Sequence, residues 1–253
     1  MEQNGKIAII TGATGGIGFA VAKRLGYDGY TVIINGIQDD EGAKRVAELE
    51  AAGITAEYYG FDVTKEEAVT KNITSIGEKY GKIDVLVNNA GGLGGRSRFE
   101  DMTTEFYRFV MALNLDSVFF ASRAAIPFLK KGDHPTIINY TSNAGWNAGG
   151  PGAGIYGTSK AAVHTITRAL AKDLAEYGIR VNAVSPGTID TDFHKQIKST
   201  KPEVFASWAK NIMLGRLGQP EDVAGVVSFL AGKDAAFLTA ETIQVGGGQA
   251  LGI

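Results

Sequence analysis

The sequence contains no cysteine, and this absence excludes several kinds of chemistry. A chain without thiols has no disulfide framework, no thiolate metal site and no cysteine nucleophile. Histidine is scarce as well, since the only three are His134, His164 and His194. They lie far apart along the chain and lack the spacing of metal ligands. We therefore expect an enzyme or binding protein that uses no metal.

Strong charge and long apolar runs are also missing. The formal net charge is −2 and 21% of the residues are charged, so the chain lacks the basic footprint of a nucleic-acid-binding protein. The opening residues Met-Glu-Gln-Asn-Gly do not resemble the basic start of a secretory signal, and no apolar run approaches the length needed to span a membrane. We expect a cytoplasmic protein with neither a nucleic-acid nor a membrane partner.

Short apolar segments alternate with segments of helical periodicity along the whole chain, without a linker or repeat. We expect strands near residues 6–11, 31–35, 55–60, 83–88, 135–141, 179–185 and 241–246. We expect helices near residues 16–27, 40–52, 65–80, 103–130, 156–177 and 220–231, the third one starting with a capping box at residues 64–67. This order predicts an α/β fold for a single domain over residues 1–253, with a doubly wound, seven-stranded parallel sheet and helices on both faces. Its ligand would bind at the carboxyl ends of the strands.

The first strand-to-helix connection is rich in glycine. An apolar, β-branched run at residues 6–11 is followed by Gly-Ala-Thr-Gly-Gly-Ile-Gly at residues 12–18, and a helical segment comes next. Glycines in this context let the backbone approach a pyrophosphate at the positive end of a helix. The same pattern also occurs in ordinary strand-to-helix turns, but the strand before it and the helix after it favour dinucleotide binding.

Tyr156 and Lys160 are four residues apart at the start of a predicted helix, so both side chains lie on one face. A phenol has a pKa near ~10 in water, and a nearby cation favours the phenolate. The pair is therefore a candidate general acid/base, although the same spacing is common on surface helices.

The glycine spacing and the Tyr-x-x-x-Lys motif together resemble the short-chain dehydrogenase/reductase family, whose fold is a Rossmann fold. The resemblance extends over essentially the whole chain and includes matching residues after the later strands and one in a helix. These are Asp62 and Val63, Asn88 to Gly91, Asn114 in the long fourth helix, Ser142, and Pro186, Gly187 and Thr188 with Thr191.

This resemblance implies an NAD(P)H-dependent carbonyl reductase. Ser142 would hold the substrate carbonyl oxygen and Tyr156 would protonate it, while Lys160 would lower the pKa of the phenol and bind the nicotinamide ribose. Asn114 would anchor a water that relays protons to Lys160, and residues 190–216 would form a helical lid. The implied cofactor-binding residues are Gly12, Thr14, Gly15, Gly16, Ile17, Gly18, Gly36, Asp62, Val63, Asn88, Ala90, Gly91, Tyr156, Lys160, Pro186, Gly187, Thr188 and Thr191.

The cofactor preference should be decided after the second strand. Family members specific for NAD usually have an aspartate where Gly36 stands, and members specific for NADP have a basic residue there or in the glycine loop. Residues 12–18 and 35–41 contain no arginine or lysine, and residues 39–41 are all acidic. We expect NAD(H) to be preferred and NADP(H) to remain possible.

Residues 88–96, 149–156 and 186–195 resemble the uronate reductases of bacterial alginate breakdown. Those enzymes reduce the aldehyde of 4-deoxy-L-erythro-5-hexoseulose uronate to give 2-keto-3-deoxygluconate. The implied substrate contacts are Arg96, Ser142, Tyr156 and His194. A guanidinium suits a carboxylate substrate, although Arg96 is equally well explained as a solvated loop residue.

Other functions on the same scaffold stay open. A 3-oxoacyl thioester reductase could use Lys130, Lys131, Arg168 and Lys172 as a patch for an acyl carrier protein, and other sugar or alcohol dehydrogenases share the same motifs. A non-catalytic binding protein is disfavoured by the intact motif residues. Apolar stretches on more than one face of the helices near residues 118–121 and 161–166 predict a homotetramer.

Overall fold

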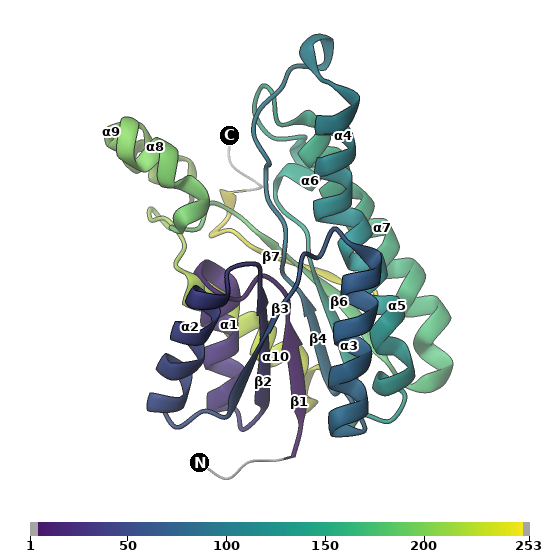
Figure 1. Ribbon diagram of the computed structural model, residues 1–253. Helices are drawn as coiled ribbons and strands as arrows, with labels where there is room; N and C mark the ends of the chain where they lie inside the picture. The colour runs from purple at the N-terminus through teal and green to yellow at the C-terminus, as the bar shows by residue number, and fades with distance from the viewer. Residues whose placement is uncertain (1–4, 250–253) are drawn as a thin grey trace.

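The computed structural model describes residues 5–249 and contains one parallel sheet with helices on both faces (Figure 1). The strands are β1 (Ile7–Ile10), β2 (Thr31–Gly36), β3 (Ala56–Gly60), β4 (Val85–Asn88), β5 (Thr136–Tyr140), β6 (Arg180–Pro186) and β7 (Thr242–Val245). Their order in the sheet is β3-β2-β1-β4-β5-β6-β7, and every pairing is parallel. The doubly wound, seven-stranded sheet predicted from the sequence is confirmed.

The central strands are buried along their whole length because helices cover both faces of the sheet. Every residue of β1, β2 and β4 is buried, and most of the residues in these strands are apolar. The edge strands β3 and β7 are only partly buried. Burial on both faces explains why the central strands appear as continuous apolar runs in the sequence.

Two layers of helices enclose the sheet (Figure 1). The helices α1 (Gly16–Tyr27), α2 (Asp39–Ala51) and α10 (Pro220–Ala231) pack on one face, where Leu25, Leu49 and Val223 are buried in one core. The helices α3 (Glu66–Tyr80), α5 (Ser117–Leu129) and α7 (Gly154–Leu174) pack on the other face, with Ile73 and Leu129 in a second core.

Shorter elements lie near the carboxyl ends of the strands. They are α4 (Thr104–Met111), α6 (Ala144–Asn147), α8 (Lys195–Thr200), α9 (Pro202–Ser207) and the 3-10 segments Phe99–Asp101, Asp192–His194 and Trp208–Asn211. Two further 3-10 segments, Ala175–Tyr177 and Lys233–Ala235, follow α7 and α10. The pair α8 and α9 projects from the body of the molecule at the position predicted for the lid (Figure 1).

Two local predictions differ from the structure. The helix expected over residues 103–130 contains a π-helical segment, Ala112–Asp116, between α4 and α5. The capping box expected at residues 64–67 does not form, because Lys65 is the N-cap of α3 and caps it with no side-chain bond. The side chain of Thr64 instead donates to Asp62 Oδ1 at 2.8 Å, which forms a turn before the helix.

The expectation that no apolar run reaches membrane-spanning length is wrong. The helical stretch Thr104–Leu129 is long and apolar enough to pass that test by length and composition. A core helix of a soluble protein passes the same test, and here Ala121, Ala125 and Leu129 are buried among the side chains of α3 and α7. The apolar character of this stretch is explained by the layer that it forms.

Candidate active site

A cavity of about 590 Å³ opens at the carboxyl ends of the strands, where the predicted motifs meet. Its lining combines the glycine loop, the segments after β4, β5 and β6, the start of α7 and the lid. Among the lining residues predicted from the sequence are Gly12, Gly15, Gly16, Ile17, Gly18, Gly91, Arg96, Ser142, Tyr156, Lys160, Pro186, Gly187, Thr188, Thr191 and His194. This volume lies in the range of small-molecule and cofactor binding sites.

Two glycines of the loop are required by close backbone packing. Gly12 has a φ of +61°, and a Cβ there would lie 2.9 Å from the Cα of Ala90. A Cβ on Gly18 would lie 2.5 Å from the Gly12 carbonyl oxygen and from the Asn89 side chain. The loop therefore packs directly on the segment after β4, which leaves its other side free to face the cavity.

The N-terminus of α1 is suited to an anion. Its N-cap, Gly15, makes no side-chain cap, and the first turn carries no acidic residue. A Cβ added to Gly15 would meet nothing within 4 Å, so the backbone is open on this side. The unpaired N–H groups of the first turn and the helix dipole together favour a phosphate here. These residues fit the pyrophosphate of a dinucleotide.

The side chains of Asn88 and Asn89 have different surroundings. Asn88 is buried and donates to Ser122 Oγ at 3.1 Å and to Asn139 Oδ1 at 2.8 Å, so its side chain belongs to the core and not to the cavity lining. The neighbouring Asn89 lines the cavity and donates to the carbonyl oxygens of Thr11 and Gly12. Asn89 therefore holds the glycine loop, whereas the sequence analysis included Asn88 and not Asn89 among the cofactor-binding residues.

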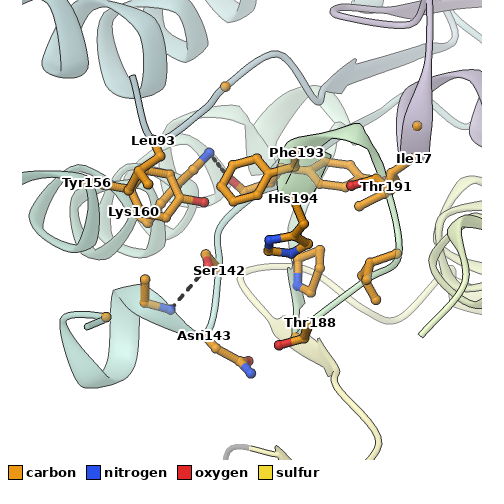
Figure 2. Close-up of a pocket in the computed structure, with 18 of the residues that line it drawn as sticks. Ile17, Leu93, Ser142, Asn143, Tyr156, Lys160, Thr188, Thr191, Phe193 and His194 are labelled. Carbon is orange, nitrogen blue, oxygen red and sulfur yellow. Dashed lines mark hydrogen bonds between the residues drawn. The ribbon is translucent and has the colours of Figure 1, made fainter. Parts of the chain in front are cut away.

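Tyr156 lies in the first turn of α7, and its side chain faces the Ser142 region across the cavity (Figure 2). Burial raises the pKa of the Tyr156 phenol, and a hydrogen bond with the Ser142 side chain opposes this rise. The sequence analysis expected the pKa to be lowered by Lys160, and that expectation is wrong for this structure. A phenol with a raised pKa is protonated at neutral pH, which is the state that a proton donor needs.

The position of Lys160 explains why it does not lower the pKa of Tyr156. Its side chain is 3% exposed, and its Nζ donates to the Tyr140 carbonyl oxygen at 2.9 Å while lying 5.9 Å from the centre of the Tyr156 ring. Burial lowers the pKa of Lys160 to about 8. The ammonium is held at the floor of the cavity by a backbone oxygen, one helical turn from Tyr156, and not by the phenol itself (Figure 2).

Asn114 is completely buried in the π-helical segment. Its Nδ2 donates to the carbonyl oxygens of Gly92 and Val110, each at 2.9 Å, and its Oδ1 accepts from the Gly92 N–H at 3.0 Å. A Cβ on Gly91 would lie 2.8 Å from Asn114 Oδ1 and 2.9 Å from Lys160 Nζ. Gly91, Asn114 and Lys160 therefore converge, and the π turn points the amide toward the lysine.

The lid brings an aromatic cluster to the cavity. The Phe193 ring lies 6.3 Å from the Tyr156 ring, and the His194 ring lies 5.4 Å from both Phe205 and Trp208. Burial lowers the pKa of His194, which the Asp190 carboxylate opposes and Lys198 and Arg96 reinforce. Phe193 and His194 line the cavity, while Phe205 and Trp208 pack behind His194 within the lid.

Arg96 lines the cavity from the loop after β4. It is exposed, and its Nη1 donates to the Pro151 carbonyl oxygen at 2.8 Å across the mouth of the cavity. Its partner is a neutral carbonyl, and within residues 5–249 no carboxylate forms an ion pair with the Arg96 guanidinium. Arg96 and Tyr156 line the same cavity, and a guanidinium is suited to binding a carboxylate.

The far end of the cleft contains a basic residue that the sequence analysis missed. Arg45 of α2 donates from Nε to the Thr14 carbonyl oxygen at 2.9 Å. Its guanidinium also pairs with Glu41 at 2.8 Å and Glu48 at 3.0 Å. At this end a Cβ on Gly36 would lie 2.5 Å from the Thr14 side chain, so the usual aspartate would not fit without a shift. Of the other predicted cofactor residues, Ala90 packs against Gly12, and Asp62, Val63 and Ala90 do not line the cavity.

Comparison with known families agrees with this geometry. Residues 12–250 match a short-chain dehydrogenase family model described as enoyl-(acyl carrier protein) reductase. The chain is 39% identical over 254 residues to a diacetyl reductase from Staphylococcus aureus that forms (S)-acetoin, covering 97% of this chain and 98% of the relative.

Two further proteins are similar over nearly the full length. The 3-oxoacyl-(acyl-carrier-protein) reductase FabG of Thermotoga maritima is 36% identical over 248 residues, covering 98% of this chain and 99% of the relative. The crystal structure of the NADH-dependent reductase A1-R′, responsible for alginate metabolism, superposes with a TM-score of 0.87 at 34% identity, covering 98% of this chain and 97% of that chain. The chain therefore belongs to the short-chain dehydrogenase/reductase family and is an oxidoreductase that uses NAD(P)(H).

Proposed function

We propose that this enzyme reduces the aldehyde of an acidic sugar, 4-deoxy-L-erythro-5-hexoseulose uronate, to 2-keto-3-deoxygluconate with NADH. The observation that carries the proposal is the position of Arg96, whose cationic side chain lines the same cavity as Ser142 and Tyr156. A carboxylate bound there would lie beside the groups that handle the carbonyl. His194 adds a ring N–H to the same wall from the lid.

The cofactor, when bound at the glycine loop, supplies the hydride that reduces the carbonyl carbon. The residues of the chain do the rest: Ser142 donates a hydrogen bond to the carbonyl oxygen, and Tyr156 gives that oxygen its proton as the alcohol forms. The proton is replaced from solvent through Lys160 and Asn114, which converge beneath Gly91. The Phe193 ring lies 6.3 Å from the Tyr156 ring, and closure of the lid over the substrate would keep water away.

The resemblance to A1-R′ supports an alginate-derived substrate, since that reductase is responsible for alginate metabolism. The similarity to a diacetyl reductase and to FabG supports two other carbonyl substrates, a small diketone and a 3-oxoacyl thioester. Both alternatives lack a free carboxylate near the reacting carbonyl, and so they leave the Arg96 guanidinium without a partner. For this reason we rank the keto-uronate first.

The test compares the three substrates with the native enzyme and an Arg96→Gln variant. We expect kcat/KM to be highest with the uronate and to fall by about 10- to 100-fold in the variant, because a charged hydrogen bond is worth roughly 1.5–3 kcal/mol. Turnover of diacetyl, which carries no charge, should stay within twofold. Arg98→Gln is the matched control, since Arg98 lies two residues away and is exposed. Equal losses on diacetyl and on the uronate would refute the role of Arg96.

We also propose that the enzyme prefers NADH. The only arginine that reaches the glycine loop among the described residues is Arg45, and its charge is already balanced by Glu41 and Glu48. A 2′-phosphate would therefore meet local acid and no available cation. A1-R′ is likewise described as NADH-dependent.

A homotetramer is proposed as the working form. Val118, Ala121 and Val163 are buried within the chain itself and are therefore not available for an interface between subunits. Phe119 of α5 is 43% exposed, and Tyr107 and Phe109 of the preceding helix α4 are exposed as well. Burial of such rings against a second copy would explain them. Sedimentation of a stable monomer at micromolar concentration would remove this proposal.

A further inference from the structure

We propose that Gln249 is a positioning residue, which clamps the segment that carries Ser142 to the segment that carries Thr188. The inference rests on the proposed reduction at Tyr156, and it concerns a side chain from the last part of the described chain. Gln249 lines the cavity together with Asn143 and Thr188. Neither the motifs nor the family resemblance selected it.

The Gln249 amide joins two strand ends. Its Oε1 accepts from the Thr188 backbone N–H at 2.8 Å and from Asn143 Nδ2 at 3.2 Å, and its Nε2 donates to Thr188 Oγ1 at 2.9 Å. Asn143 directly follows Ser142 after β5, and Thr188 follows Pro186 and Gly187 after β6. The Gln249 side chain therefore bridges the segment that would hold the substrate oxygen and the segment that follows β6.

The orientation of these amides is determined by the backbone. The Thr188 N–H is a donor, so the atom of Gln249 facing it must be the oxygen, and Asn143 must then present its NH₂ group. This arrangement leaves Asn143 Oδ1 buried without a hydrogen-bond partner. An unpaired buried acceptor is costly, which indicates that the bond to Gln249 dictates how Asn143 sits.

Glycines after β6 and after β7 allow Gln249 to come close to the Thr188 segment. A Cβ on Gly187 would lie 2.7 Å from Gln249 Oε1 and 2.7 Å from the Cα of Gly246. Gly247 and Gly248 have φ values of +57° and +85°, and they turn the chain back after β7. The Gln249 N–H then donates to the Gly246 carbonyl oxygen at 2.9 Å. The glycine run after the last strand thus builds the turn that delivers Gln249.

The same turn holds the end of the lid. The Leu214 N–H donates to the Gly247 carbonyl oxygen at 3.1 Å, and a Cβ on Gly248 would lie 2.6 Å from the Met213 sulfur. The Gln249 turn therefore contacts the Ser142 segment, the Thr188 segment and the lid. Removing the amide should misplace the carbonyl relative to the hydride donor without destroying the cofactor site, and small misplacements of this kind cost much rate.

The experiment compares Gln249→Ala with Gln249→Glu, and uses Gln244→Ala on the exposed face of β7 as the matched control. In Gln249→Ala we expect kcat to fall about tenfold while the Kd for NADH, from fluorescence titration, stays within twofold. Backbone hydrogen exchange in the segment at residues 186–189 should become about tenfold faster, because the Thr188 N–H loses its acceptor. The carboxylate of Gln249→Glu can still accept from Thr188 and Asn143, so this variant should recover most of the kcat and the protection.

Either of two results would overturn the proposal: hydrogen exchange at residues 186–189 that is unchanged in Gln249→Ala, or loss of protection with an unchanged kcat. If Gln249→Ala does not fold, kcat and hydrogen exchange in Gln249→Glu decide whether the clamp exists. A side chain needed only as a neutral amide would not be replaced by a carboxylate, whereas a hydrogen-bond acceptor for Thr188 and Asn143 would be. If the native enzyme reduces no carbonyl in the substrate panel, the proposed function fails, while the exchange measurement still decides whether the clamp exists.

Discussion

The two halves of the cleft are built in different ways. The nucleotide half is held by backbone contacts, such as Gly12 against Ala90 and the Asn89 amide on two loop carbonyls. The substrate half is made of side chains on loops and short helices, with Arg96 exposed and Phe193 and His194 on the lid. The first half tolerates few changes because its shape depends on the absence of side chains. The second half can change its side chains without disturbing the sheet, and this is where relatives with different substrates should diverge.

Tyr156 belongs to both halves, and its replacement should have the largest effect. In Tyr156→Phe the ring is retained and only the proton donor is lost, so kcat for reduction should fall by about 10³-fold or more. NADH affinity should change by less than about twofold, because the cofactor contacts of the glycine loop remain. Steady-state kinetics and NADH fluorescence titration measure the two effects separately. Near-normal turnover would end the proposed mechanism.

Lys160 should show a mixed effect that distinguishes it from Tyr156. Lys160→Ala removes a buried ammonium that we propose both binds the nicotinamide ribose and relays protons, so both kcat and NADH affinity should fall, kcat by about 10²-fold. Lys172→Ala is the matched control, because Lys172 is exposed further along the same helix. A loss confined to kcat would mean that Lys160 does not contact the cofactor.

The nucleotide half and the sheet could be predicted from the sequence because they depend on periodicity and glycine. The helices predicted at residues 16–27 and 220–231 have the same bounds as α1 and α10. The π turn around Asn114 could not be predicted, since it adds one backbone residue to a helix without any change in composition. The capping box failed because Asp62 competes for Thr64.

Most side-chain contacts across the cleft could not be predicted from the sequence. Asn88 and Asn89 are identical residue types, and only the direction of the strand end decides which one enters the core. Arg45 and Gln249 come from segments with no recognisable motif, and their contacts depend on tertiary approach. The three glycines before Gln249 were the one visible signal of that turn.

The pH dependence of turnover sharpens the role of Lys160. Its pKa in the folded enzyme is about 8, below the ordinary value of 10.5, because burial disfavours the charged form. The ammonium is therefore present below about pH 8 and is lost as the pH rises through that value. We expect kcat for reduction to be constant on the acid side and to fall about tenfold per pH unit above it. A Lys160→Ala enzyme should lack this decline, and a native profile flat to pH 10 would contradict the assignment.

The smallest effect concerns the adenosine end of the nucleotide half. Ile37 follows β2 and is 75% exposed, so an arginine there could reach a 2′-phosphate without disturbing the core. Ile37→Arg should shift the ratio of kcat/KM for NADPH over NADH by about tenfold, or about 1.4 kcal/mol. Ile37→Gln is the control for side-chain length without charge. The acid at residues 39–41 should limit the gain, because it repels the same phosphate. If the unmodified enzyme instead prefers NADPH by tenfold, then Arg45 must leave Glu41 and Glu48 to bind the phosphate, and Arg45→Gln would abolish that preference.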